Sequence, residues 1–297
     1  MISPIDEPGT DNAGNPYTSA KEMWRLEAGE GDEAKEKQKK EEWYRNGVAY
    51  WENVEASVDG VLGGYGHVSS VDIAESEAFL KETYGARLVE TGDQPLRALD
   101  CGAGVGRISK NLLLKHFHKV DLLEPARHFL DAARVSLSAG PSGEGAEGTS
   151  GHRAVNFFYQ GAQEFTPEAG RYDVIWVQWF IGHLTDQDFV NFFQRAKDGL
   201  KPGGIFILKE NTAHSGFVVD KEDHSITRSH PYFLDLFKRA GMQVHRTKLQ
   251  NSFPKELFKV RMYAVSPEGG PPLPAPLPKK QYSTRQKSRA NLPGRIS

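Results

Sequence analysis

The sequence has little of what characterises secreted, membrane-spanning or zinc-binding proteins. Its single cysteine, Cys101, rules out an internal disulfide and indicates a reducing compartment. One cysteine with scattered histidines gives no zinc-ligand spacing. No apolar run approaches the roughly 18 residues that a membrane-spanning helix needs, and residues 1–8 lack the basic and apolar regions of a secretory signal. We therefore expect no metal, no membrane partner and a cytoplasmic location.

The net charge of −2 is small but unevenly distributed. Residues 266–297 carry six lysines and arginines against one glutamate, so this tail has a charge of +5 and residues 1–265 have −7. An acidic body argues against nucleic acid as the main ligand and is compatible with a cationic one. The basic tail fits a nuclear-import signal, which would add the nucleus as a location, a partner-binding segment, or neither.

Composition divides the chain into three parts. Residues 1–42 are expected to be a disordered, charged extension, in which residues 30–42 (EGDEAKEKQKKEE) form a solvated helix. Residues 43–265 are expected to be one domain, with a helical cap at 43–90 and a Gly/Ser-rich surface insertion at 139–151. Residues 266–297, which include PPLPAPLP, read as a disordered proline-rich tail. The oligomeric state stays open.

Strands and helices alternate along the central domain. Apolar strand-like runs lie at 96–101, 119–124, 155–160, 172–180, 205–210, 242–249 and 257–265. Helical patterns separate most of them, including one that starts at a capping-box-like Thr185. The pattern predicts an α/β fold with a mostly parallel sheet covered by helices on both faces. In such sheets a ligand binds beyond the carboxyl ends of the strands, where the strand order reverses.

A glycine-rich turn follows the first strand of this alternation. Residues 100–106 read Asp-x-Gly-x-Gly-x-Gly, whereas the dinucleotide fingerprint needs its third glycine at position 107, which is Arg107. Glu124 ends the next strand and suits the ribose of S-adenosylmethionine or of NAD equally. Arg107 fits a forked contact with a ligand carboxylate, or a solvated residue of the first helical turn; the loop alone leaves both open.

Four segments together resemble the protein α-N-terminal methyltransferase family, and the loop resembles the first motif of class I methyltransferases. The segments are YWENVEASVDGVLGGYGHVSSVDI (50–73), LDCGAGVGRISKNLLL (99–114), YDVIWVQWFIGHLTD (172–186) with KPGGIFILKEN (201–211), and DKEDHSITRS (220–229). The GGYGH and QWFIGHLTD strings carry most of the specificity, and the resemblance covers about residues 43–265. It implies a seven-stranded class I fold that transfers methyl from S-adenosyl-L-methionine to N-termini beginning Xaa-Pro-Lys or Xaa-Pro-Arg, with S-adenosyl-L-homocysteine as the product.

The resemblance also assigns roles to residues. The cofactor is expected to contact Gly102, Arg107, Glu124, Gln163, Gln178 and Trp51. The substrate peptide is expected to contact Trp179, Asn211, Asp220, Ser225, Leu62, Gly63 and Val68. The residues beside the reacting amine are expected to be Asp223 and His183. Phe258 stands where relatives often have tyrosine, so a hydroxyl is missing there.

The chemistry explains why an acid or an imidazole is needed. A free α-amine has a pKa of about 7.7–8.0, so at neutral pH it is mostly protonated and has no lone pair to attack the methyl group. A nearby carboxylate or imidazole accepts the proton. Taken singly, however, Asp220 and Asp223 read as solvated loop acids, and His183 and Trp179 as core residues. Three alternatives therefore stand: an NAD-dependent oxidoreductase, a methyltransferase for lysine side chains or small molecules, and a catalytically silent peptide-binding relative.

Overall fold

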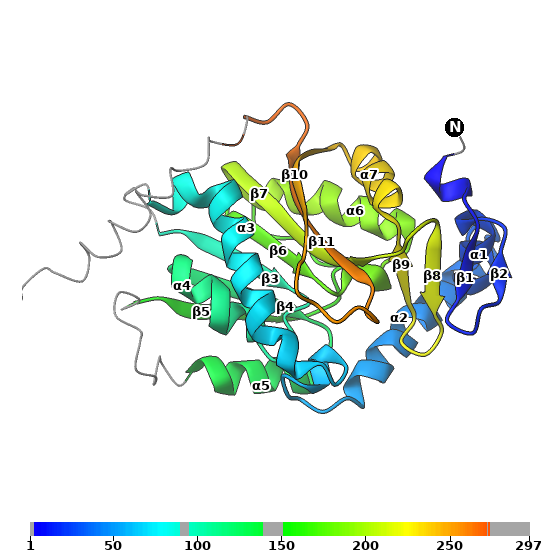
Figure 1. Cartoon of the computed structure of the whole chain (residues 1–297), viewed down its shortest axis with the longest axis horizontal. Helices are drawn as coiled ribbons and strands as arrows, with labels where there is room; N and C mark the ends of the chain where they lie inside the picture. Colours follow the sequence, from blue (N-terminus) through cyan, green and yellow to red (C-terminus); the bar gives the residue numbers. More distant parts are fainter. Residues whose placement is uncertain (1–2, 90–94, 139–150, 272, 274–297) are drawn as a thin grey trace, which may run out of the picture.

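The computed structural model describes residues 3–89, 95–138, 151–271 and 273 (Figure 1). Most of the insertion expected at 139–151 and most of the tail expected after residue 266 lie outside these described residues. No helix in the described ranges is both long enough and apolar enough to span a bilayer.

The central element is a seven-stranded sheet with the order β10-β11-β7-β6-β3-β4-β5. Its strands are β3 (Arg97–Cys101), β4 (Lys119–Glu124), β5 (Arg153–Tyr159), β6 (Tyr172–Gln178), β7 (Leu200–Thr212), β10 (Met242–Leu249) and β11 (Lys259–Pro267). Neighbours from β7 through β5 pair in parallel, and β11 pairs antiparallel with both β7 and β10. The predicted mostly parallel sheet is confirmed. The strand order reverses between β3 and β6, so their carboxyl ends are where a ligand is expected.

Helices cover both faces of this sheet (Figure 1). One face carries α3 (Ser69–Val89), a π-helical turn at Ser109–Leu113 that leads into α4 (Leu114–His116), and α5 (Arg127–Ser138). The other face carries α6 (Asp186–Ala196) and α7 (His230–Arg239). Thr185 caps α6 as predicted, because its side chain accepts a hydrogen bond from the backbone N–H of Asp188.

The prediction of a helical cap over residues 43–90 is partly wrong. Its second half, α3, is a helix of the sheet face, because Ile73, Leu80 and Tyr84 recur at helical spacing and join the core beneath it. Its first ten residues belong to α2 (Glu36–Glu52), which crosses the carboxyl ends of the strands (Figure 1). Between α2 and α3 the chain forms loops with 3₁₀ turns at Gly60–Leu62 and Gly66–Val68.

The N-terminal extension is ordered, which corrects the expected disorder of residues 1–42 over its described part. It contains a 3₁₀ turn at Pro4–Asp6, β1 (Gly9–Asp11), β2 (Pro16–Tyr17), α1 (Ala20–Glu27) and the start of α2. β1 and β2 extend a second sheet, of order β2-β1-β8-β9, with the hairpin β8 (Phe217–Asp220) and β9 (Ser225–Arg228). The sequence does not predict these strands, because β1 pairs with a strand about 200 residues away and such a pairing produces no local periodicity.

Candidate functional site

A pocket lies at the carboxyl ends of β3 and β4, where the strand order predicts a ligand. We call it the loop pocket. The empty space between its walls is about 880 Å³, a figure that includes open solvent at its mouth. The glycine turn supplies Gly102 and Gly104, the end of β4 supplies Glu124, and the turn after β5 supplies Gln163. Helix α2 closes the pocket with Trp51 and its apolar neighbours.

The glycine turn and Glu124 are built as one unit. Gly102 has a φ of +65°, and a β-carbon there would lie 2.6 Å from the ring of Phe180. The two oxygens of Glu124 accept hydrogen bonds from the backbone N–H groups of Gly104 and Ala126, each at 2.8 Å. Burial raises the pKa of the Glu124 carboxyl to about 7. The carboxyl group is thus fixed in direction, and its remaining lone pairs are available to ligand hydroxyls.

A second pocket adjoins the loop pocket and shares a wall with it. This second pocket is lined by Leu62, Gly63 and Val68 on one side and by Asn211 and Ser225 on the other. The shared wall consists of Trp51, Val61, Trp179, Phe180 and His183. Groups bound in the two pockets would therefore contact the same five side chains.

Trp179 adopts an unusual backbone conformation in that wall. It follows the end of β6 with a φ of +52°, which is rare for a bulky side chain and marks a strained, over-determined position. Its backbone N–H donates to the Lys209 carbonyl at 3.2 Å, which holds the turn. Its indole Nε1 is buried without a hydrogen-bond partner among the described residues. The ring therefore offers the pockets both an apolar face and an unused donor.

His183 is held in one tautomer by two neighbours. The indole N–H of Trp51 donates to its Nε2 at 3.1 Å, so Nε2 is the acceptor and the proton is assigned to Nδ1. Nδ1 then donates to the backbone carbonyl of His224 at 3.1 Å. Both ring nitrogens are thus engaged, and the imidazole is fixed against the turn that carries Asp223.

Two carboxyl groups face the second pocket with unused oxygens. Oδ1 of Asp223 and Oε2 of Glu210 are buried without a hydrogen-bond partner in the described part of the chain. Burial raises the pKa of Asp223, and nearby His183 opposes the shift. Burial also raises the pKa of Glu210 to about 8. Buried polar atoms are almost always paired in folded proteins, so these orphaned acceptors indicate a place where a polar ligand completes the site.

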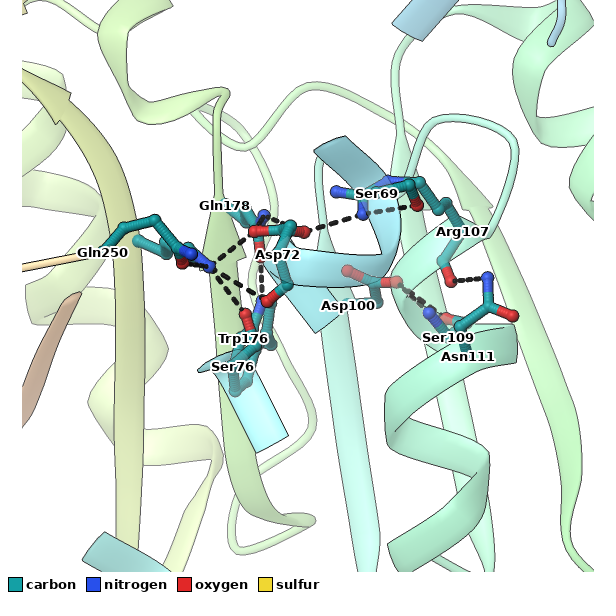
Figure 2. A network of polar contacts seen from close by, with 11 residues as sticks. Ser69, Asp72, Ser76, Asp100, Arg107, Ser109, Asn111, Trp176, Gln178 and Gln250 are labelled. Atoms are coloured by element: carbon teal, nitrogen blue, oxygen red, sulfur yellow. Dashed lines mark hydrogen bonds and ion pairs between the residues drawn. The ribbon is translucent and has the colours of Figure 1, made fainter. Parts of the chain in front are cut away.

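Three of the predicted site residues do not line either pocket. Nη1 of Arg107 donates to Asp72 at 2.7 Å and to Ser69 at 3.3 Å, and Nε2 of Gln178 donates to both Asp72 oxygens at 3.1 Å (Figure 2). Asp220 accepts a hydrogen bond from Asn12 of the N-terminal segment. The other predicted residues line the pockets as expected: Trp51, Gly102, Glu124 and Gln163 in the loop pocket, and Leu62, Gly63, Val68, Trp179, His183, Asn211, Asp223 and Ser225 in the second.

A buried ionic network beneath the site was not predicted. Asp72 of α3 lies between Arg107 and Lys209, whose Nζ is 2.5 Å from Oδ1 of Asp72, and all three side chains are buried. Burial alone would raise the pKa of Asp72, but the two cations outweigh it and lower the pKa. The available signal was a lysine inside an otherwise apolar strand, because a buried lysine requires an anionic partner. Glu210, the next residue in the chain, was also not predicted as a site residue, and its acidic side chain within the same apolar strand was the available signal.

Comparison with known proteins places this geometry in a family. The sequence profile of the AdoMet-dependent proline di-methyltransferases matches residues 39–266. This chain belongs to that family. It is an S-adenosylmethionine-dependent methyltransferase, and its sheet is the seven-stranded class I arrangement that the resemblance implied.

The methyltransferase is also similar to individual relatives over most of its length. Alpha N-terminal protein methyltransferase 1 of Arabidopsis thaliana is 56% identical over 291 residues, which cover 97% of this chain and 99% of that protein. N-terminal Xaa-Pro-Lys N-methyltransferase 1-B of Xenopus laevis is 43% identical, with 75% of this chain and 95% of that protein covered. A solved SAM-dependent methyltransferase from Leishmania major superposes with a TM-score of 0.74 at 38% identity, covering 90% of this chain and 98% of that one.

Proposed function

We propose that this methyltransferase acts on the α-amine of protein N-termini that begin Xaa-Pro-Lys or Xaa-Pro-Arg. The observation that carries the proposal is the shared wall: the second pocket, which has a buried Asp223 oxygen without a hydrogen-bond partner among the described residues, adjoins the loop pocket at a wall that includes His183. A peptide terminus is cationic at its end and polar along its backbone, which suits unused acceptors. The names of the Arabidopsis and Xenopus relatives point to the same class of substrate.

The loop pocket fits S-adenosylmethionine by its donors, acceptors and walls. The cofactor supplies an electrophilic methyl group on a sulfonium. Of the residues that line it, Glu124 would accept hydrogen bonds from ribose hydroxyls, Gly102 would let the backbone approach the methionine part, and Gln163 would contact the adenine. Trp51 contributes an apolar wall.

Arg107 has fewer free guanidinium nitrogens than the forked contact with a ligand carboxylate assumed. Because Nη1 is committed to Asp72, only Nε and Nη2 remain for the carboxylate of the methionine part. Gln178 acts through the same network, since its amide holds Asp72 instead of facing a pocket.

The proton on the substrate amine has a better acceptor in Asp223 than in His183. One oxygen of the Asp223 carboxyl has no hydrogen-bond partner within the described ranges, whereas the Nε2 lone pair of His183 already accepts from Trp51. Asp223 would first attract the ammonium and then take its proton, which frees the nitrogen lone pair. His183 holds the Asp223 turn through its contact with the His224 carbonyl. The remaining contribution is positioning, because the amine must approach in line with the sulfur.

Specificity for the following residues arises from the walls of the second pocket and from the end of the β8–β9 hairpin, where Asp220 pairs with Ser225 of the pocket wall. The Trp179 indole packs on the flat, apolar ring of a second-position proline. Asn211 hydrogen-bonds the backbone of the first residue, and Leu62, Gly63 and Val68 line the path of the peptide. Asp220 and Ser225 lie at the two paired ends of the β8–β9 hairpin and receive a cationic third residue.

The proposal is tested with a short Ser-Pro-Lys peptide, the purified protein and S-adenosylmethionine, followed by mass spectrometry. We expect methylation of the free terminus, and none of a matched peptide whose amino terminus is acetylated. Equal methylation of the blocked peptide would assign the activity to the lysine side chain and refute the proposed acceptor.

A further inference from the structure

The N-terminal segment of residues 7–28 packs on the β8–β9 hairpin. It precedes the residues that match the family profile, which begin at residue 39. Figure 1 shows β1 and β2 beside β8, on the outer side of the hairpin. The hairpin carries the three polar residues that we assign to the substrate, Asp220, Asp223 and Ser225. A contact that fixes the hairpin therefore bears on substrate recognition.

Backbone hydrogen bonds tie the segment to β8. Thr10 and Asp11 of β1 pair in parallel with Val218 and Val219. The backbone N–H of Asn12 then donates to the Val219 carbonyl at 2.8 Å, which continues the pairing to the end of the strand. The segment is thus joined to β8 up to the residue before Asp220.

The side chain of Asn12 fixes one oxygen of Asp220. Its Nδ2 donates to Oδ1 of Asp220 at 3.0 Å, and the backbone N–H of Glu222 donates to the same oxygen at 2.9 Å. In the described part of the chain no hydrogen bond is recorded for Oδ2 of Asp220. One oxygen is therefore anchored twice while the other remains available to a cation.

The segment also restrains the one lysine of the hairpin turn, Lys221. Its Nζ lies 3.4 Å from Oδ2 of Asp11 and 3.5 Å from Oε1 of Glu27, and 5.7 Å from the ring centroid of Tyr17. Lys221 directly follows Asp220, so if released its ammonium could reach the same carboxylate. A substrate lysine would then compete with an internal one for Asp220.

We propose that residues 7–28 are a positioning element for recognition of the third substrate residue. Asn12 orients the Asp220 carboxylate, and Asp11 with Glu27 holds Lys221 away from it. This inference rests on the proposed function, since it assumes that Asp220 binds a substrate lysine or arginine. Asn12 is a positioning residue: in the described part of the chain its hydrogen bonds go to Asp220 and Val219, neither of which lines a pocket.

The first test is the variant Asn12→Ala, assayed with Ser-Pro-Lys and Ser-Pro-norleucine peptides. We expect KM for the lysine peptide to rise about fivefold with kcat unchanged, and KM for the norleucine peptide to stay as in the wild type. Lys21→Ala, on the exposed surface of α1 in the same segment, is the matched control and should change neither. An equal loss on both peptides, with a lower Tm, would indicate a purely structural role and overturn the inference.

The second test is rescue. Asp11→Asn together with Glu27→Gln keeps the shapes of both side chains and removes their charges. We expect KM for the lysine peptide to rise about threefold, and adding Lys221→Ala to restore it. Failure of Lys221→Ala to restore KM would overturn the competition argument. If the wild type methylates Ser-Pro-Lys and every variant has the wild-type KM, only this inference is refuted. If the wild type is inactive on that peptide, the proposed function is refuted as well.

Discussion

Asp223 and His183 lie close together, but only one of them has an unused atom. Oδ1 of Asp223 has no partner among the described residues, while both nitrogens of His183 are engaged. We therefore expect Asp223→Asn to lower kcat on a Ser-Pro-Lys peptide by about 100-fold or more, as for loss of a general base. Steady-state kinetics with saturating S-adenosylmethionine measures this.

The control for that variant is Glu222→Gln, an exposed neighbour on the same turn that removes the same charge. It should retain near wild-type kcat. Full turnover by the Asp223→Asn enzyme would mean that another group acts as the base, and His183→Asn would then be the variant to examine.

Sequence strings pointed to most of the residues that line the two pockets, but not to their hydrogen bonds. QWFIGHLTD identified Trp179 and His183, both of which line the second pocket. It did not reveal that Trp51 holds His183, or that Asp220 is anchored by Asn12, because these contacts join residues 132 and 208 positions apart. Side-chain partners at such separations follow from the tertiary fold and leave no local pattern.

The glycine turn between β3 and its helix depends on Gly102 in two ways. Its left-handed φ of +65° is costly for other residues, and a β-carbon would meet the Phe180 ring at 2.6 Å. Gly170 has a similar φ of +60°, but a β-carbon there would meet nothing within 4 Å. We expect Gly102→Ala to weaken S-adenosylhomocysteine binding at least about tenfold, and Gly170→Ala to leave it unchanged. Titration calorimetry measures the affinity of both variants. Equal affinities would contradict the requirement for glycine at position 102.

The contact between α3 and β7 depends on a buried acid that is shared by two cations. Replacing Asp72 by asparagine leaves Arg107 and Lys209 facing one another without a counter-charge, which we expect to lower the free energy of unfolding by about 3–5 kcal/mol. Lys209→Met should cost clearly less, because Asp72 keeps Arg107 and Gln178. Urea denaturation of both variants gives the comparison. The reverse order would show that Lys209, and not Asp72, is the centre of the network.

At the level of elements, the sequence predicted what has a local period. The buried strands and the amphipathic helices of residues 96–265 repeat at intervals of 2 or 3.6 residues or as apolar runs, and they appear where expected. The hairpin β8–β9 was read only as a polar motif, and β1 was read as disorder. These short strands belong to the four-stranded second sheet, in which β1 and β8 are the inner pair. They stabilise one another, together with the buried rings of Tyr17 on β2 and Phe217 on β8, whose centroids are 6.1 Å apart.

Across the whole molecule, three buried acids share one property. Burial raises the pKa of Asp100 to about 6, of Glu124 to about 7 and of Glu210 to about 8. In the unfolded chain these carboxyl groups titrate near pH 4. Between these values the folded chain holds protons that the unfolded chain has lost, so raising the pH favours unfolding. The contribution of these three acids to the free energy of unfolding should therefore decrease as the pH rises from about 5 to 8. Burial lowers the pKa of His224, His230 and His245, and these histidines act in the opposite direction.

Glu210 provides the sharpest check of this dependence, because its pKa is raised the furthest and one of its oxygens is unpartnered. Glutamine keeps the shape of the neutral acid and does not ionise. We expect Glu210→Gln to equal the wild type in stability near pH 4.5 and to exceed it increasingly up to pH 8, by up to about 1 kcal/mol per pH unit. Urea denaturation at pH 5, 6.5 and 8 measures the gap, with Glu222→Gln as the exposed control. A gap that stays constant with pH would mean that Glu210 ionises normally in the folded protein, so that solvent or a counter-charge reaches it.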